Sequence, residues 1–167
     1  MAESNVIRTK RDGIITITDS GGAHSYVVAY EPGDFEYSVP DAATLMMLDR
    51  GVIGATPSLR LGDEEPMTFS FSAHFRDAGS TTYATLLDIL HRYAGNYVVT
   101  SWVSTLGTSS DVPLTLTVAL TIDGTAFGEA DRTLTFPYSV LKGDVAEGDP
   151  NKVSVKGTSY RIRPTLS

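Results

Sequence analysis

The feature that most constrains the fold is a strict alternation of apolar and polar residues in two separate stretches of the chain. In residues 67–75 every second residue is apolar, namely Met67, Phe69, Phe71, Ala73 and Phe75. In residues 114–122, Leu, Val and Ile alternate with Thr and Ala in the same way. Successive side chains of a strand point to opposite faces, so a period of two is typical of half-buried β-strands. The sequence therefore predicts strands that each present one face to a core.

Shorter strands are predicted on both sides of these two. Residues 12–19 and 25–30 form a predicted hairpin, because a Ser-Gly-Gly turn separates two apolar runs. Residues 34–39 follow as a third strand. Residues 132–140 are predicted to form another strand, in which Pro137 indicates an edge position or a bulge, since proline has no N–H to donate to a neighbour.

One helix is predicted, at residues 80–94. Apolar residues recur there at spacings of three and four, which places them on one side of a helix with Ser80 or Thr81 as its N-cap. Asp88 and Arg92 are expected to pair on the solvent side, because they lie four residues apart. Together these elements predict a mainly β fold: a β-sandwich or small barrel flanked by one α-helix, with a long intersubunit loop.

The length of 167 residues predicts one domain spanning residues 1–167, because domains commonly contain about 100 to 200 residues. Residues 1–11 are expected to form an N-terminal arm, and residues 151–167 a C-terminal strand or arm. The strand at 67–75 is expected to pair with residues 57–61 across a turn that contains glycine and proline.

The long loop, residues 40–55, carries no convincing strand pattern but contains an apolar run at 45–48. Loops longer than about 12 to 15 residues are uncommon in compact domains and are often functional. Two interpretations stay open: a short helix between Asp41 and Gly51 that joins the core, or an arm that contacts a neighbouring subunit. The candidate contact residues are Leu45, Met46, Met47, Leu48, Asp49, Arg50, Val52 and Ile53.

Composition argues against several classes of protein. The net charge of −7 disfavours an ordinary nucleic-acid binder, because such proteins use Lys and Arg to displace the counterions of phosphates. The absence of cysteine excludes disulfides, thiolate metal sites and cysteine nucleophiles. No segment approaches the roughly 18 apolar residues of a membrane helix, and residues 1–13 contain no apolar leader core, so no membrane insertion is expected.

The sequence offers no constellation for catalysis, so an enzyme is not expected and no cofactor is predicted. His24, His74 and His91 lack metal-ligand spacing, and no nucleophile elbow, Walker loop or dinucleotide fingerprint is present. The segment from Asp144 to Asn151 gathers oxygen ligands as a calcium loop does, although turns are rich in such residues for their own reasons.

Several segments follow one another in an order that is similar to a known family. They are residues 12–19 (DGIITITD), 25–39 (SYVVAYEPGDFEYSV), 48–51 (LDRG) and 62–75 (GDEEPMTFSFSAHF), followed by the single helix. In this order they resemble the major tail tube proteins of long-tailed bacteriophages with non-contractile tails. The resemblance covers about residues 11–95 in motif and the rest only in pattern.

The resemblance implies a β-sandwich with one helix that assembles into hexameric rings, which stack into a tube around a channel. DNA would pass through this channel without specific binding. The implied partners are other copies of the chain, the tape measure protein, the tail terminator and the distal tail proteins. The implied location is the tail of a virion that is made in the host cytoplasm.

The channel wall can be assigned if residues 34–39 and 57–75 form the inner sheet. The channel-facing candidates are then Glu36, Ser38, Thr68, Ser70 and Ser72. They offer hydroxyl groups and acid but little base, with Arg60 the main exception.

Two other functions stay open. The chain could be a monomeric β-sandwich module that binds carbohydrate or another protein, although this would not explain the apolar run at 45–48. It could also be the tube protein of a contractile tail or secretion system, which shares the fold.

Overall fold

The computed structural model of the chain describes residues 13–29, 34–40, 44–50, 55–61, 65–76, 84–90, 102–104, 114–125, 128–148, 150–160 and 163–167. For residues 44–50 and 55–61 it describes the course and pairing of the backbone. The expected N-terminal arm, residues 1–11, lies outside these ranges.

Ten strands and one short helix lie within this part of the chain. In chain order they are β1 (Gly13–Thr18), β2 (Ser25–Val28), β3 (Glu36–Ser38), β4 (Thr44–Arg50), β5 (Ala55–Leu61), β6 (Met67–His74), α1 (Leu86–Leu90), β7 (Leu116–Ile122), β8 (Arg132–Ala146), β9 (Lys152–Ser159) and β10 (Thr165–Leu166). The prediction of a mainly β fold with a single helix is confirmed.

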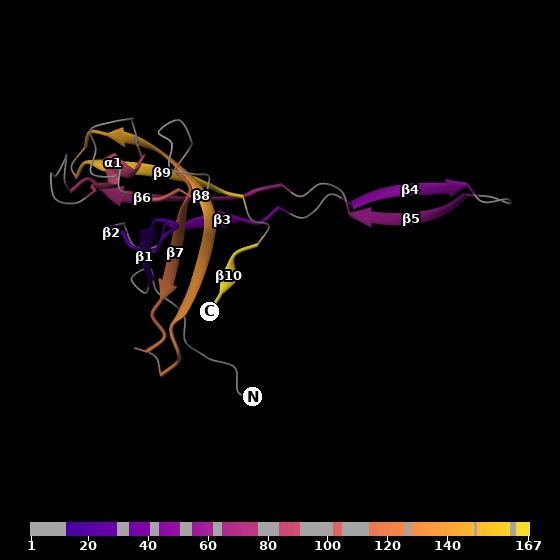
Figure 1. Cartoon of the computed structure of the whole chain (residues 1–167), viewed down its shortest axis with the longest axis horizontal. Helices are drawn as coiled ribbons and strands as arrows, with labels where there is room; N and C mark the ends of the chain where they lie inside the picture. The colour runs from indigo at the N-terminus through magenta and orange to yellow at the C-terminus, as the bar shows by residue number, and fades with distance from the viewer. Residues whose placement is uncertain are drawn as a thin grey trace.

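Most of the strands form one antiparallel sheet. Its order is β2-β1-β7-β8-β9-β6-β3, and β10 pairs with β8 beside this path. The two alternating stretches of the sequence are β6 and β7, and the apolar residues of β6 are buried as their period of two predicts. Strands β4 and β5 form a separate two-stranded sheet that extends away from the rest of the molecule (Figure 1).

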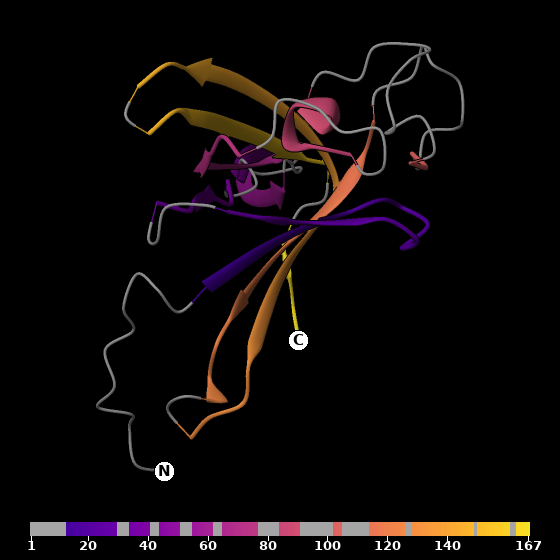
Figure 2. The same cartoon turned by 90° about the vertical axis from the view of Figure 1, so that its left-hand side faces the viewer.

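Strand β8 turns the sheet on itself. Its first half pairs with β7 and its second half with β9. The register with β7 shifts at Pro137 and Tyr138, and Tyr138 has a φ of 53°. Such a bulge bends a strand, so the two halves of the sheet diverge, as Figure 2 shows. Pro137 predicted an edge position or a bulge, and the register shift shows a bulge.

The core lies between the two halves of the bent sheet. One half contributes Ile15, Ile17, Val118 and Phe136, and the other contributes Met67, Phe69, Phe71, Val153 and Val155. The ring of Phe69 joins the halves, because its centroid lies 5.1 Å from that of Phe136. Burying one such side chain stabilises a fold by about 1.5–3 kcal/mol, so this double layer is the main source of stability.

The two ends of the sheet come together. The N–H of His74 in β6 donates a hydrogen bond of 2.7 Å to the carbonyl of Ala29, which directly follows β2. Between this contact and β3, the N–H of Ser72 donates to Oδ2 of Asp34, also at 2.7 Å. The expected sandwich or small barrel therefore takes the form of one bent sheet whose ends touch.

Helix α1 packs on the core side of the sheet. Leu86 and Ile89 are buried, and Leu90 lies over Gly143 of β8, where any larger residue would overlap with it. The backbone N–H and the hydroxyl of Thr85 both donate to Oδ2 of Asp88 at 2.9 Å, and the N–H of Asp88 donates back to the Thr85 hydroxyl at 3.4 Å, which makes Thr85 the N-cap.

This cap corrects two expectations. The helix begins at Leu86 rather than beside Ser80 or Thr81, and Asp88 is buried rather than paired on the solvent side. Helical periodicity predicts which face a side chain lies on, but it does not predict that the carboxylate of Asp88 accepts hydrogen bonds from Thr85 at the start of the same helix. Residues 91–94 of the predicted helix lie outside the described ranges.

The expectation of an irregular loop at 40–55 is wrong for residues 44–50, and residues 41–43 and 51–54 lie outside the described ranges. Residues 44–50 form β4, which pairs along its whole length with β5. The alternative of a short core helix is wrong for the same reason. The expected pairing of 57–61 with 67–75 is also wrong, because β6 pairs with β9 and β3. The strand was not predicted because the four apolar residues at 45–48 follow one another without the alternation that indicates a half-buried strand.

Candidate functional site

The first candidate surface is the two-stranded ribbon of β4 and β5, called the arm below. Its ladder runs from the pair Thr44 and Leu61 at the base to the pair Arg50 and Ala55. The chain enters the arm from β3 and leaves it into β6, and β3 and β6 are themselves paired. The arm therefore continues the outermost ladder of the main sheet beyond the body of the molecule (Figure 1).

The register gives the arm two unlike faces. Residues opposite one another in a ladder share a face, and the faces alternate along each strand. One face holds Thr44, Met46, Leu48, Arg50, Ala55, Pro57, Leu59 and Leu61, and the other holds Leu45, Met47, Asp49, Thr56, Ser58 and Arg60. Six of the eight positions on the first face are apolar, against two of the six on the second.

A ribbon of this kind needs a partner. A lone two-stranded hairpin is marginally stable in water, and a contiguous apolar face is typical of a contact surface. In the described part of the chain, β4 and β5 belong to no sheet but their own. The arm contains six of the eight candidate contact residues, and Val52 and Ile53 lie outside the described ranges. Their contact with a neighbouring subunit stays a prediction.

The second candidate surface is a hollow of about 550 Å³ on the solvent side of β3, β6, β9 and β8. It is called the hollow face below. Its lining residues are Glu36, Tyr37, Ser38, Thr68, Phe69, Ser70, Val140, Lys142, Lys156, Gly157, Thr158 and Tyr160. Four of the five predicted channel-facing residues are thus brought together: Glu36, Ser38, Thr68 and Ser70.

Strand register orders the hollow face into rows. Glu36 lies opposite Ser70, Ser70 opposite Lys156, and Lys156 opposite Lys142, so one row crosses all four strands. Ser72, the fifth candidate, is in the next row opposite Ser154 and does not line the hollow. Whether this face lines a channel stays a prediction.

The expectation of little base was made for residues 34–39 and 57–75, and the lysines of this face come from β8 and β9, which that expectation did not include. Lys142 and Lys156 lie on this face, and both are exposed. Arg60 belongs to the arm instead. The alternation in residues 152–159 could have placed Lys156 on the solvent face, but only the pairing of β9 with β6 and β8 shows that it joins this surface.

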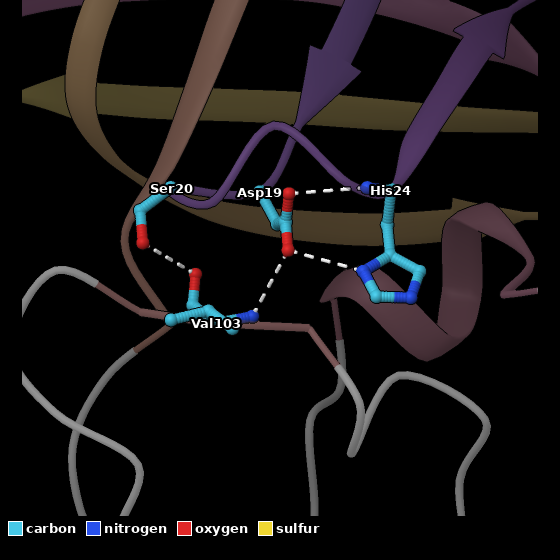
Figure 3. Close-up of polar contacts among 4 residues, drawn as sticks. All are labelled: Asp19, Ser20, His24 and Val103. Carbon is cyan, nitrogen blue, oxygen red and sulfur yellow. Dashed lines mark hydrogen bonds and ion pairs between the residues drawn. The ribbon is translucent and has the colours of Figure 1, made fainter.

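A third cluster surrounds the buried carboxylate of Asp19 (Figure 3). Its Oδ2 accepts from the N–H of Val103 at 3.2 Å and lies 3.1 Å from Nδ1 of His24. Its Oδ1 accepts from the N–H of His24 at 3.2 Å. Ser20 adds two bonds, since its N–H and its hydroxyl both donate to the carbonyl of Val103, at 3.0 and 2.9 Å.

Opposing effects act on the pKa of Asp19. Burial by itself raises it, but hydrogen bonds from the ring and N–H of His24 and from the N–H of Val103 outweigh burial and lower the pKa below its ordinary value. The carboxylate is therefore kept charged. Both oxygens accept from protein donors, so the cluster ties the turn after β1 to residues 102–104.

The other His, Asp and Glu side chains form no metal centre within the described ranges. There, no three His, Asp or Glu side chains lie close enough to hold a metal ion. In the suggested calcium segment, Asp144 is part of strand β8, and the amide oxygen of Asn151 accepts from the N–H of Gly148 at 2.8 Å. His74 lies on β6, and His91 is outside the described ranges.

Comparison with known proteins adds the architecture of the chain as a whole. No protein-family model matches the sequence, and the search of curated proteins gives no match either. A chain in the cryo-EM structure of an extracellular contractile injection system, the sheath/tube terminator of PVC in its extended state, is 10% identical, with a TM-score of 0.56. The match covers 100% of this chain and 99% of that one.

A second similar structure is the cryo-EM structure of the anti-feeding prophage baseplate, which was 6-fold symmetrised. One of its chains is 7% identical to this one, with a TM-score of 0.55, and the match covers 100% of this chain and 97% of that chain. At such low identity the likeness establishes a shared fold. The matched proteins are tail-like assembly components, and neither is described as part of a non-contractile phage tail.

In the described part of the chain, no helix is long and apolar enough to cross a bilayer.

Proposed function

We propose that the chain is a structural subunit of the tube of a phage-tail-like particle, which assembles with copies of itself into stacked hexameric rings and performs no catalysis. The observation that carries the proposal is the arm. In the described residues β4 and β5 pair only with each other, and a neighbouring copy would cover the apolar residues that the register places on one face of the arm.

The comparisons support an assembly of the contractile kind more than one of the non-contractile kind. The sheath/tube terminator belongs to a contractile injection system, and the chain matches it over its whole length. The symmetry applied to the baseplate supports six copies in a ring. We therefore propose that the chain belongs to the tail of a phage or phage-like particle, and that tape measure, terminator and distal tail proteins are its partners.

In this proposal the hollow face lines the channel. Its concave shape suits the inside of a tube, and its edge strand β3 has exposed residues that could continue the sheet into the next subunit. Passage of DNA would follow if the particle is a phage, and passage of protein if it is an injection system.

Electron microscopy of the purified chain at high concentration tests assembly. We expect rings or tubes. A variant with Met46→Asp and Leu59→Asp, which charges the apolar face at one cross-strand pair, should stay folded and fail to assemble. The matched control is Met47→Asp with Ser58→Asp, the adjacent pair on the opposite face, which should still assemble. Tubes from the first variant, or small particles from the unmodified chain, would contradict the proposal.

The channel assignment has its own test. The chain has no cysteine, so Ser70→Cys creates one thiol on the hollow face. In tubes a small maleimide should react and a bulky polymer-linked maleimide should not, whereas both should react with the dissociated chain. Equal reaction of the bulky reagent with tubes and dissociated chain would place this face on the outside.

The hollow face also favours a second function, a monomeric module that binds a ligand with the lysine-bearing sheet surface. Monodisperse small particles at every concentration would favour this second function over the tube.

A further inference from the structure

The hollow face carries a charge arrangement that the tube proposal does not explain. Lys142 and Lys156 lie directly opposite one another on β8 and β9, and both are exposed. Like charges in directly opposed positions destabilise a sheet, because their Cβ atoms lie about 4.5–5.5 Å apart. Neutral residues at these two positions would avoid the repulsion. The adjacent pair of Thr68 and Thr158 is neutral in this way.

Among the described residues, no acidic side chain lies in ion-pair contact with either lysine. Glu36 stands at the far end of the same row, separated from Lys156 by Ser70. Asp144 follows Lys142 on β8 and forms no ion pair with it. An anionic group from outside the chain would therefore remove the repulsion and find hydroxyl donors beside it.

We propose that the lysine pair binds carboxylate side chains of an acidic polypeptide that lies in the hollow face. This inference rests on the proposed function, in which that face lines the channel and the polypeptide is its content. Six copies in a ring would present six lysine pairs at one level, which strengthens binding through multivalency.

The charges favour a polypeptide over a nucleic acid. Affinity for nucleic acid grows with the number of phosphates that Lys and Arg neutralise. Here two lysines stand beside the acids Glu36 and Asp144, on a chain of net charge −7. Two lysines can neutralise few phosphates of a continuous nucleic-acid backbone, whereas two lysines are enough to bind one or two carboxylates spaced along a peptide.

The test measures anisotropy of a fluorescent poly-glutamate peptide, with the purified chain kept below the concentration at which it forms tubes. Replacing both lysines, by Lys142→Gln with Lys156→Gln, should weaken binding by about tenfold for each lysine removed. Arg132→Gln removes one positive charge at the start of β8, outside the lining of the hollow, and should leave binding unchanged. Glu36→Gln should tighten binding of the peptide, because it removes the negative charge that lies in the same row as the lysines and repels the carboxylates of the peptide.

Two further readouts separate the possible results. Lys156→Gln alone should raise the melting temperature of the free chain, since it relieves the repulsion, and this shows that the variant folds. Stronger binding of an oligothymidylate of matched charge would overturn the choice of a polypeptide. Poly-glutamate binding that is absent, or that does not depend on the two lysines, would overturn the inference.

The inference and the proposed function fail separately. Tubes that form without any peptide binding would leave the function standing and remove the carboxylate site. Peptide binding by a chain that never forms tubes would keep the carboxylate site and remove the proposed tube function.

Discussion

Asp19 links segments that lie far apart in the sequence. Its carboxylate accepts hydrogen bonds from His24 in the hairpin turn and from Val103, more than eighty residues away along the chain. The ring of His24 in turn stacks on Trp102, with centroids 6.0 Å apart. A buried group of this kind is costly to leave without partners, so each donor stabilises the fold only while the acceptor is present.

We predict that Asp19→Asn destabilises the protein by about 1–3 kcal/mol at neutral pH, because an amide cannot accept with both of its terminal atoms. The lowered pKa makes the ionised carboxylate a source of stability above the unfolded pKa of about 3.9. This contribution is lost as the pH falls through the folded pKa. Urea unfolding from pH 7 to pH 2 should therefore show a shallower acid decline in the variant. Asp144→Asn, on an exposed strand face, serves as the control.

Gly157 is a second residue whose identity is set by one contact. It lies inside β9, opposite Phe69 of β6, and a Cβ at this position would overlap with the phenyl ring. The ring cannot move aside easily, because it packs against Phe35 and Phe136. Glycine thus continues the strand here, although its place in the sequence suggests a break.

We predict that Gly157→Ala costs about 1–3 kcal/mol through overpacking. The double variant with Phe69→Ala should cost less than the sum of the two single changes, since the second change removes the clash. Thermal unfolding of the three variants measures this coupling. Strict additivity would show that the ring does not limit residue 157.

At the scale of elements, α1 depends on its first turn. It is a helix of 5 residues, so its stability comes from packing and capping rather than from length. Asp88 holds both the N–H and the hydroxyl of Thr85, and all of these groups are buried. The docking of Leu86 and Ile89 on the core therefore requires this cap.

We predict that Asp88→Ala lowers the free energy of unfolding by about 1–3 kcal/mol, because it leaves a buried N–H without an acceptor. Thr85→Ser keeps a hydroxyl in the same position and should have a much smaller effect. Denaturant unfolding compares the two variants. Equal losses would indicate that the methyl group of Thr85, and not the cap, is what matters.

At the scale of the whole molecule, a closed body and a projecting arm divide stability from assembly. The bent sheet satisfies its core within one chain, whereas the arm has an apolar face and a ladder of its own. Removing the arm should therefore leave the body folded and remove a contact between copies. A variant without the arm is therefore expected to fold, enter tubes together with unmodified subunits and limit the length of those tubes.

We predict that a variant in which a short Gly-Ser turn replaces residues 44–61 unfolds at nearly the same temperature as the full chain. Mixed with unmodified subunits, it should shorten tubes in proportion to its share, because each incorporated copy offers a site without an arm. Negative-stain microscopy measures the length distribution. Tubes of unchanged length, with the variant incorporated, would show that the arm is dispensable.

The sequence by itself determined the elements whose signal is local. Alternation in residues 67–75 and 114–122 predicted β6 and β7, and Pro137 predicted an edge or a bulge in β8, because backbone geometry and proline chemistry act within a few residues. The apolar run at 45–48 predicted a contact surface, which stays a prediction, and its lack of alternation gave no sign of a strand.

Tertiary structure alone decided which strands are neighbours. The pairing of β6 with β9, the turning of the sheet at β8 and the row from Glu36 to Lys142 depend on contacts between distant segments. The hollow face was therefore predicted in part from β3 and β6, and its lysines were missed. The sequence of one strand specifies which of its own residues share a face. The charge of the whole face also includes residues of the neighbouring strands, and only the tertiary packing determines which strands those are.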